Sequence, residues 1–168
     1  MKYDIILEIN ELKFEIIGIK VKLNNISVNI ISFYLPPDNN KNKNYNQFND
    51  EFFEKLDSLK PFILIGDLNC HYSSWYCKKN TTKGKILNEY LEKYNFNVIN
   101  KNKDTFYSDI HNSGSVIDLM IISNDLSDKI KEFTVHPNDM LSDHFPISCS
   151  FNIKTAHIKN PYTVYLKK

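Results

Sequence analysis

Arginine is absent from this chain, so all 21 basic side chains are lysines. Asn, Lys and Ile are used heavily, a bias typical of AT-rich coding sequence. The chemical consequence is that a bound phosphate would meet point charges rather than the bidentate fork of a guanidinium. With 20 acidic residues, the formal net charge is only +1. This balance excludes a strongly basic nucleic-acid-binding protein, although a local basic rim remains compatible with it.

Cysteine is scarce as well, and the three cysteines are Cys70, Cys77 and Cys149. Their number is odd and none of them forms a C-x-x-C pair, so neither a disulfide framework nor a structural zinc site is expected. Reduced thiols in an intracellular protein fit this pattern better. The chain also lacks an apolar run long enough to cross a bilayer, and its first residues lack the layout of a signal peptide. We therefore expect no association with a membrane.

The length of 168 residues and the hydrophobic content of 42% are enough for one domain with its own core. We expect that domain to occupy residues 1–153. The Lys- and Asn-containing stretch 154–168 is interpreted as a tail or linker.

Strand and helix patterns alternate along the chain. Runs rich in β-branched and aromatic residues predict strands, and apolar residues at helical spacing predict two helices. The predicted strands cover 3–9, 14–21, 26–34, 62–65, 96–99, 105–107, 116–122, 133–135 and 145–153, and the predicted helices cover 48–59 and 86–94. Asn24-Asn25 predicts a hairpin, and the wholly apolar run 62–65 is typical of a strand buried on both faces. Hairpins together with crossovers favour a mixed sheet with helices packed outside over a doubly wound parallel sheet.

The first candidate for chemistry is Gly66-Asp67-Leu68-Asn69, directly after the apolar run. If the strand continues, the carboxylate and the carboxamide point the same way. Asp67 could then activate a water or bind a hard cation, and Asn69 could donate to a phosphate oxygen. An ordinary turn explains the tetrapeptide equally well, since Gly, Asp and Asn all favour turns.

Three further candidates lie at predicted strand ends or inside a strand. Asp143 and His144 are adjacent and precede an apolar run, which places a carboxylate beside an imidazole. Asp118 lies within a run that is otherwise typical of a core strand, and a buried carboxylate needs a partner. His144 is the natural one, because carboxylates commonly orient imidazoles. Tyr34 ends its strand before Pro36, and taken alone each of these residues could be a plain turn or surface residue.

In order along the chain, these residues form the set Tyr-x-Pro-Pro, Gly-Asp-x-Asn, Ile-Asp and Ser-Asp-His. This set resembles the endonuclease/exonuclease/phosphatase superfamily over about residues 13–153. The stretch from Gly66 to Trp75 and the basic-Gly-x-x-Leu of Lys83 to Leu87 are more specific, and resemble the endonuclease domains of non-LTR retrotransposons. The resemblance implies a DNase I-like four-layer α/β fold, a sandwich of two mixed β-sheets flanked by helices.

The resemblance also implies roles in the hydrolysis of a phosphodiester. Asp67 would be the general base that activates water, and Asn69 would hold that water and the phosphate. Asp118 would orient His144, which would contact the phosphate and stabilise its developing charge. Tyr34 would donate to the phosphate.

A divalent cation is implied as well. Asp143 together with Asp67 would bind it, and oxygen ligands favour Mg²⁺ or Mn²⁺ over zinc. His71 and Thr105 are weaker candidates for contact with substrate, and packing is the commoner role for a residue such as His71 or Trp75. The implied substrate is DNA, which adds the nucleus as a candidate location. A reverse transcriptase domain would accompany this domain in a longer parent protein.

One part of the family pattern is missing. The family carries an Asn after its first strand and then a Gln-Glu whose carboxylate is the main metal ligand, and no residue here fills those places. We therefore expect a domain that is incomplete at its N-terminus, so that whether it is an enzyme stays open. Two alternatives are a catalytically inactive remnant of the domain and a phosphatase that acts on phospholipid or inositol phosphates.

Overall fold

The computed structural model describes residues 3–11, 14–23, 26–37, 48–137 and 142–153. The stretch interpreted as a tail, 154–168, lies outside these residues, so the proposed domain boundary stays a prediction. The strands are β1 (Tyr3–Glu11), β2 (Phe14–Leu23), β3 (Ile26–Tyr34), β4 (Phe62–Asp67), β5 (Phe96–Val98), β6 (Phe106–Ser108), β7 (Ser113–Ser115), β8 (Asp118–Ser123), β9 (Ile130–Val135) and β10 (Ile147–Phe151). The helices are α1 (Asp50–Ser58), α2 (Thr82–Tyr94) and the short 3₁₀ turns η1 (Ser73–Trp75) and η2 (Asn124–Lys129).

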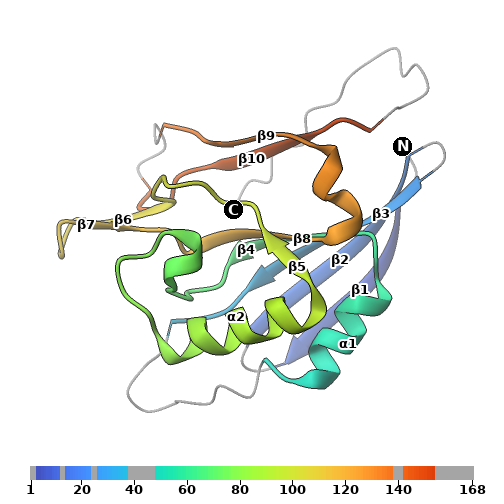
Figure 1. Ribbon diagram of the computed structural model, residues 1–168, viewed down its shortest axis with the longest axis horizontal. Coiled ribbons are helices and arrows are strands. Elements are labelled where there is room, and N and C mark those ends of the chain that lie inside the picture. Colours follow the sequence, from blue (N-terminus) through green and yellow to red (C-terminus); the bar gives the residue numbers. More distant parts are fainter. Residues whose placement is uncertain (1–2, 12–13, 24–25, 38–47, 138–141, 154–168) are drawn as a thin grey trace.

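A six-stranded sheet with the order β1-β2-β3-β4-β8-β5 forms the centre of the molecule (Figure 1). The strands β1, β2 and β3 pair antiparallel, which confirms the predicted hairpin between β2 and β3. β4 lies parallel to β3 and antiparallel to β8. The predicted mixed sheet is therefore confirmed, and the parallel pair is connected through α1 as a crossover requires.

Both α-helices of the described residues pack on one face of this sheet (Figure 1). Each begins at a side-chain cap, because Asn49 accepts from Phe52 N and Thr81 accepts from Gly84 N. α2 therefore begins at Thr82, before the first apolar residue of the helical pattern at position 86. Its C-terminus is set by Asn95, which adopts the left-handed conformation with φ 55°.

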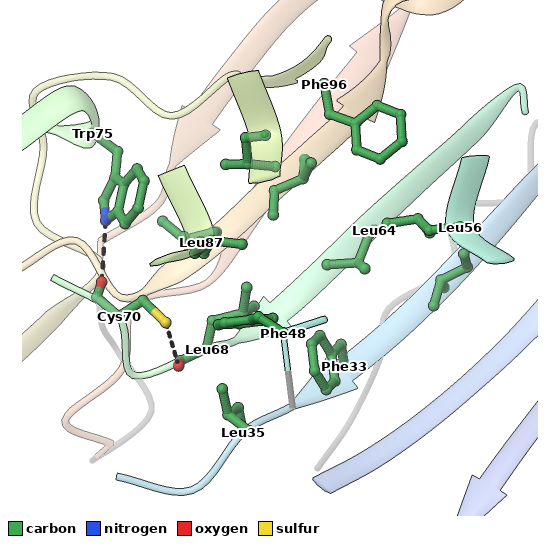
Figure 2. Packing of buried hydrophobic residues seen from close by; sticks show 14 of the residues in the cluster. Phe33, Leu35, Phe48, Leu56, Leu64, Leu68, Cys70, Trp75, Leu87 and Phe96 are labelled. Carbon is green, nitrogen blue, oxygen red and sulfur yellow. Dashed lines mark hydrogen bonds between the residues drawn. The ribbon is translucent and has the colours of Figure 1, made fainter. Parts of the chain in front are cut away.

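Alternate side chains of the central strands face these helices (Figure 2). The residues that form this core are Ile31, Phe33, Leu64, Leu119 and Ile121 from the sheet, Phe53 and Leu56 from α1, and Leu87 and Leu91 from α2. All of them are 4% exposed or less, so this layer holds the sheet rigid under the loops that follow β3 and β4.

The opposite face of the sheet is covered by the antiparallel pair β9–β10. Met120 on β8 packs with Phe133 and Val135 of β9, and Ile63 and Ile65 of β4 join the same cluster. β4 is thus buried between the helices and the second sheet, as its unbroken apolar run predicts. The α/β sandwich of sheets flanked by helices is confirmed, and within the described ranges its second sheet consists of β9 and β10.

Two local predictions differ from the structure. β7, which pairs with β6 in a small hairpin, was not predicted, because Ser113-Gly114-Ser115 has no apolar pattern. The strand predicted for 116–122 begins only at Asp118, so this residue stands at the strand end rather than inside it. The backbone N–H groups of Ile117 and Asp118 both donate to the hydroxyl of Thr105 where β8 begins.

Candidate active site

The ends of β4 and β8 bring two carboxylates face to face. Asp67 is the last residue of β4 and Asp118 the first of β8, and the antiparallel register pairs them directly. Side chains at paired positions lie on the same face of the sheet, about 4.5–5.5 Å apart at Cβ. Like charges in this arrangement repel, so a cation or a proton is favoured between them.

The electrostatic surroundings raise the pKa of Asp67 above its usual value. Burial is the largest cause, and the charge of Asp118 adds to it. His144 and the hydrogen bonds from Asn69 act in the opposite direction without cancelling the effect. Because a carboxylate with a raised pKa is a stronger base, Asp67 is better matched to proton abstraction than an exposed aspartate.

Asp118 holds the ring of His144. The Nδ1 atom of His144 lies 3.0 Å from Oδ1 and 2.9 Å from Oδ2 of Asp118, and both side chains are mostly buried. A carboxylate only accepts, so Nδ1 is the donor and Nε2 is the acceptor nitrogen of the neutral ring. Phe106 packs against the same ring with centroids 4.9 Å apart and forms a backbone bridge with His144.

Asn69 ties the β4 end to the β3 end. Its backbone N–H donates to Oδ1 of Asp67 over 3.1 Å, and its Nδ2 donates to the carbonyl of Leu35 over 3.0 Å. The N–H of Leu35 donates to the carbonyl of Asp67 over 2.9 Å. Tyr34, half exposed, is the residue before Leu35 and ends β3.

The geometry of Asn69 shows that the strand does not continue past Asp67, which leaves unmet the condition for Asp67 and Asn69 to point the same way. β4 ends at Asp67, and Asn69 has φ 48°, in the left-handed region that Asn tolerates. The first half of the tetrapeptide therefore ends β4, and the left-handed conformation of Asn69 directs its amide toward Leu35. Gly66 permits the close approach of the two strand ends, because a Cβ there would lie 1.8 Å from the carbonyl oxygen of Phe33.

Thr105 supports the Asp118–His144 pair through the backbone. It is 0% exposed, and its Oγ1 accepts from Ile117 N over 3.1 Å and from Asp118 N over 2.9 Å. Its own carbonyl accepts from the N–H of Phe145, the residue after His144, over 2.8 Å. The structure thus gives Thr105 a role in positioning, while its predicted contact with substrate stays a prediction.

Asn100 is a second support for Asp118. Its side chain is buried, donates to the carbonyl of Asp118 over 2.9 Å and accepts from the N–H of Met120 over 2.9 Å. It was not among the predicted residues. The only signal was its place just after an apolar strand, which is also where ordinary turns begin.

The loop after Asn69 is packed from inside. Trp75 is 1% exposed, its Nε1 donates to the carbonyl of Cys70 over 3.1 Å, and the thiol of Cys70 donates to the carbonyl of Leu68 (Figure 2). Trp75 therefore packs the loop.

His71 is half-buried, and its surroundings lower the pKa of its ring. Burial is the largest cause, and the charges of Lys79 and Lys83 add to it. A contact of His71 with substrate stays a prediction.

The metal assignment has incomplete support in the geometry. Asp143 is exposed, and its backbone carbonyl accepts from Tyr107 N over 2.8 Å, next to the Asp118–His144 pair. Carboxylate oxygens such as those of Asp67 fit Mg²⁺ or Mn²⁺ by chemistry. However, the part of the chain that the structure describes contains no group of three or more His, Cys, Asp and Glu that could hold a metal ion.

Removal of the Thr105 hydroxyl tests its support of Asp118. Thr105→Val leaves the N–H groups of Ile117 and Asp118 without this acceptor, so we expect a loss of at least about 2 kcal/mol in the free energy of unfolding. Thr105→Ser keeps the hydroxyl and should lose about 1 kcal/mol. Urea denaturation measures both. Thr134→Val, half-buried on β9, is the control, and equal losses in the Val and Ser variants would contradict the role of the hydroxyl.

The raised pKa of Asp67 predicts a stability that depends on pH. The folded protein binds the proton more tightly than the unfolded chain, so the stabilisation is present below the ordinary value of 3.8 and is lost as pH rises through the folded pKa. Asp67→Asn removes this titration. Its melting temperature relative to the wild type should therefore be higher at pH 7 than at about pH 3.5.

Thermal melts of both proteins at the two pH values provide the measurement. Ser32→Ala, on the exposed part of β3, changes no titrating group. Its melting temperature should differ from that of the wild type by the same amount at both pH values. A difference for Asp67→Asn that does not change with pH, or that grows toward acid, would show that the carboxyl is not held at a raised pKa.

Comparisons with known proteins identify the family of the chain. The family model described as Endonuclease-reverse transcriptase matches residues 28–148, a range that contains every candidate site residue. No curated protein matches the chain.

Several solved structures share the fold. The endonuclease domain of TRAS1, a telomere-specific non-LTR retrotransposon, aligns with a TM-score of 0.70 and 20% identity over 91% of this chain and 70% of that chain. An AP endonuclease from Archaeoglobus fulgidus aligns with a TM-score of 0.61 and 14% identity over 89% of this chain and 71% of that chain. A variant of the 3' phosphatase NExo from Neisseria, bound to a product DNA hairpin, aligns with a TM-score of 0.59 and 15% identity. This alignment covers 81% of this chain and 64% of that chain. Since the family match covers well over half of the residues, the chain belongs to the endonuclease–reverse transcriptase family of the endonuclease/exonuclease/phosphatase superfamily.

Proposed function

We propose that this chain is a phosphodiesterase domain that nicks DNA on behalf of a retroelement. The observation that carries the proposal is the pair of opposed carboxylates at the ends of β4 and β8, one of which holds an imidazole. Hydrolysis of a phosphodiester needs an activated water and neutralisation of the charge that develops on the phosphate. Asp67 would activate the water, and the Asp118–His144 pair would neutralise the charge on the phosphate.

In this reaction Asp67 accepts a proton from water, and the oxygen of that water attacks phosphorus. The bond from phosphorus to the leaving sugar oxygen then breaks, and that oxygen takes a proton from a solvent water to leave as the hydroxyl. Asn69, fixed at its backbone by Asp67 and at its amide by Leu35, lies next to the attacking water and orients it. His144, whose ring is oriented by Asp118 through Nδ1, donates to a phosphate oxygen through Nε2–H of its imidazolium form. Tyr34 donates to another of the phosphate oxygens.

A divalent cation, Mg²⁺ or Mn²⁺, is part of the proposal. Asp67 and Asp143 would hold it, and when bound it would neutralise the phosphate and place it for attack. Because fewer than three acidic or imidazole ligands gather among the described residues, water and phosphate would complete its shell. We therefore expect weak metal affinity and slow nicking by the 168-residue chain.

The partners are proposed by analogy with the family. DNA is the proposed substrate, as the bound DNA hairpin of the Neisseria relative suggests by analogy. A reverse transcriptase domain in a longer parent protein and a location in the nucleus are the further parts of the proposal. Among the described residues no helix is long and apolar enough to cross a membrane.

A DNA-binding domain without turnover is the second candidate. The lack of a group of three or more acidic, His or Cys ligands among the described residues favours it, since loss of the metal would abolish hydrolysis and leave the fold intact. A single measurement distinguishes the two candidates, because an inactive domain would bind DNA without cleaving it.

Conversion of supercoiled plasmid to open circles tests the proposal. We expect slow nicking at millimolar-scale Mg²⁺, as a rough figure for a poorly liganded ion, and none with EDTA. Asp67→Ala should reduce the rate by at least about 100-fold, because the general base is lost. Asp125→Ala, an exposed aspartate on η2, should leave the rate unchanged.

Asp118→Asn separates orientation from binding in the same assay, since its turnover should fall far more than its affinity for DNA. Nicking that persists in EDTA, or Asp67→Ala at the wild-type rate, would refute the proposed chemistry. Binding of DNA without nicking at any metal concentration would favour the inactive domain.

A further inference from the structure

Lys83 lies in a position that local physical chemistry disfavours. It is the second residue of α2 and only 2% exposed. Burial of an ammonium group is costly, and a cation at a helix N-terminus also opposes the helix dipole. Departures from local rules of this kind concentrate at functional positions.

The ammonium group of Lys83 reaches the segment that follows Tyr34. Its Nζ donates to the carbonyl of Pro36 over 2.9 Å. Just before it, the carbonyl of Leu35 accepts from Nδ2 of Asn69, and the N–H of Leu35 donates to the carbonyl of Asp67. Two consecutive carbonyls are thus bound by side chains from two different parts of the chain.

The sequence of this segment explains why side chains from elsewhere must hold it. Pro36 and Pro37 have no backbone N–H, so the chain beyond Leu35 cannot continue the ladder of β3 as a donor. The carbonyls that remain need donors from elsewhere. Lysine supplies donors on a stem long enough to cross from α2, and it accepts nothing in return.

The first turn of α2 also holds the second site loop. The N–H of Thr81 donates to the carbonyl of His71 over 2.9 Å, and a Cβ on Gly84 would lie 2.1 Å from that same oxygen. The start of α2 therefore contacts both the segment after Tyr34 and the loop after Asn69.

We infer that Lys83 is a positioning residue, which fixes Tyr34 and Asn69 relative to Asp67 by binding the carbonyl of Pro36. With only 2% of the residue exposed, it acts through its contact with the carbonyl of Pro36 rather than by touching substrate. The consequence for catalysis rests on the proposed function, whereas the consequence for the order of the segment does not.

Hydrogen exchange in Lys83→Met tests the inference without any need for activity. Methionine fills similar volume and donates nothing. The amides of Leu35 and Asn69 should exchange at least about tenfold faster than in wild type, while those of Leu119 and Ile121 in the core strand β8 stay unchanged. Lys85→Met is the matched control, since Lys85 lies on the exposed side of the same turn and pairs with Glu89 over 3.9 Å.

Two results would overturn the inference. Unchanged exchange at Leu35 and Asn69 would show that Lys83 does not hold them. Faster exchange at all four amides would show that the residue serves global stability alone.

Nicking by the same variants gives the second readout. Lys83→Met should lower kcat by about tenfold or more and leave KM for plasmid within about twofold, because a displaced group costs turnover rather than binding. An equal change in the Lys85→Met control, or a change confined to KM, would contradict positioning. If wild type does not nick at all, the proposed function fails, and exchange alone still decides whether Lys83 positions the segment.

Discussion

The antiparallel pairing of β4 with β8 is the constraint on which the site depends. Its register sets Asp67 opposite Asp118, and a shift by one residue would turn one of them to the other face of the sheet. Apolar side chains fix that register, since Leu64 and Ile121 face the helices while Ile63, Ile65 and Met120 face β9–β10. The hydrophobic sandwich thus determines where two charged groups meet.

The stability of the fold offsets several unfavourable features at this edge. Two carboxylates oppose each other, one of them has a raised pKa, and the ammonium group of Lys83 is buried at the start of α2. Each would be destabilising alone. Their concentration at the ends of β3, β4 and β8 and the start of α2, with a well-packed core beneath, is the pattern expected of a site kept for chemistry rather than for stability.

Sequence reasoning reached the fold through features that are local. The apolar run of β4, the helical spacing of α1 and α2 and the hairpin between β2 and β3 all have short-range signals, and the structure contains each of them. The pairing of Asp118 with His144 was also predictable, because a carboxylate within an apolar run requires a partner. The left-handed conformation of Asn69, by contrast, depends on the close approach of β3 at Gly66. Thr105, Asn100 and Lys83 act on backbone groups 13, 18 and 47 positions away, and no pattern in their own neighbourhood indicates such contacts.

The protonation of His144 is the most direct test of the account. If Asp118 orients the ring, the neutral imidazole carries its proton on Nδ1. A second proton, on Nε2, then gives the imidazolium that donates to a phosphate oxygen. Nitrogen-15 NMR of the labelled imidazole, at a pH where the ring is neutral, distinguishes the two tautomers. The account predicts a protonated Nδ1 coupled to a downfield proton that is lost in Asp118→Asn. A ring protonated on Nε2, with Nδ1 as the acceptor, would contradict it.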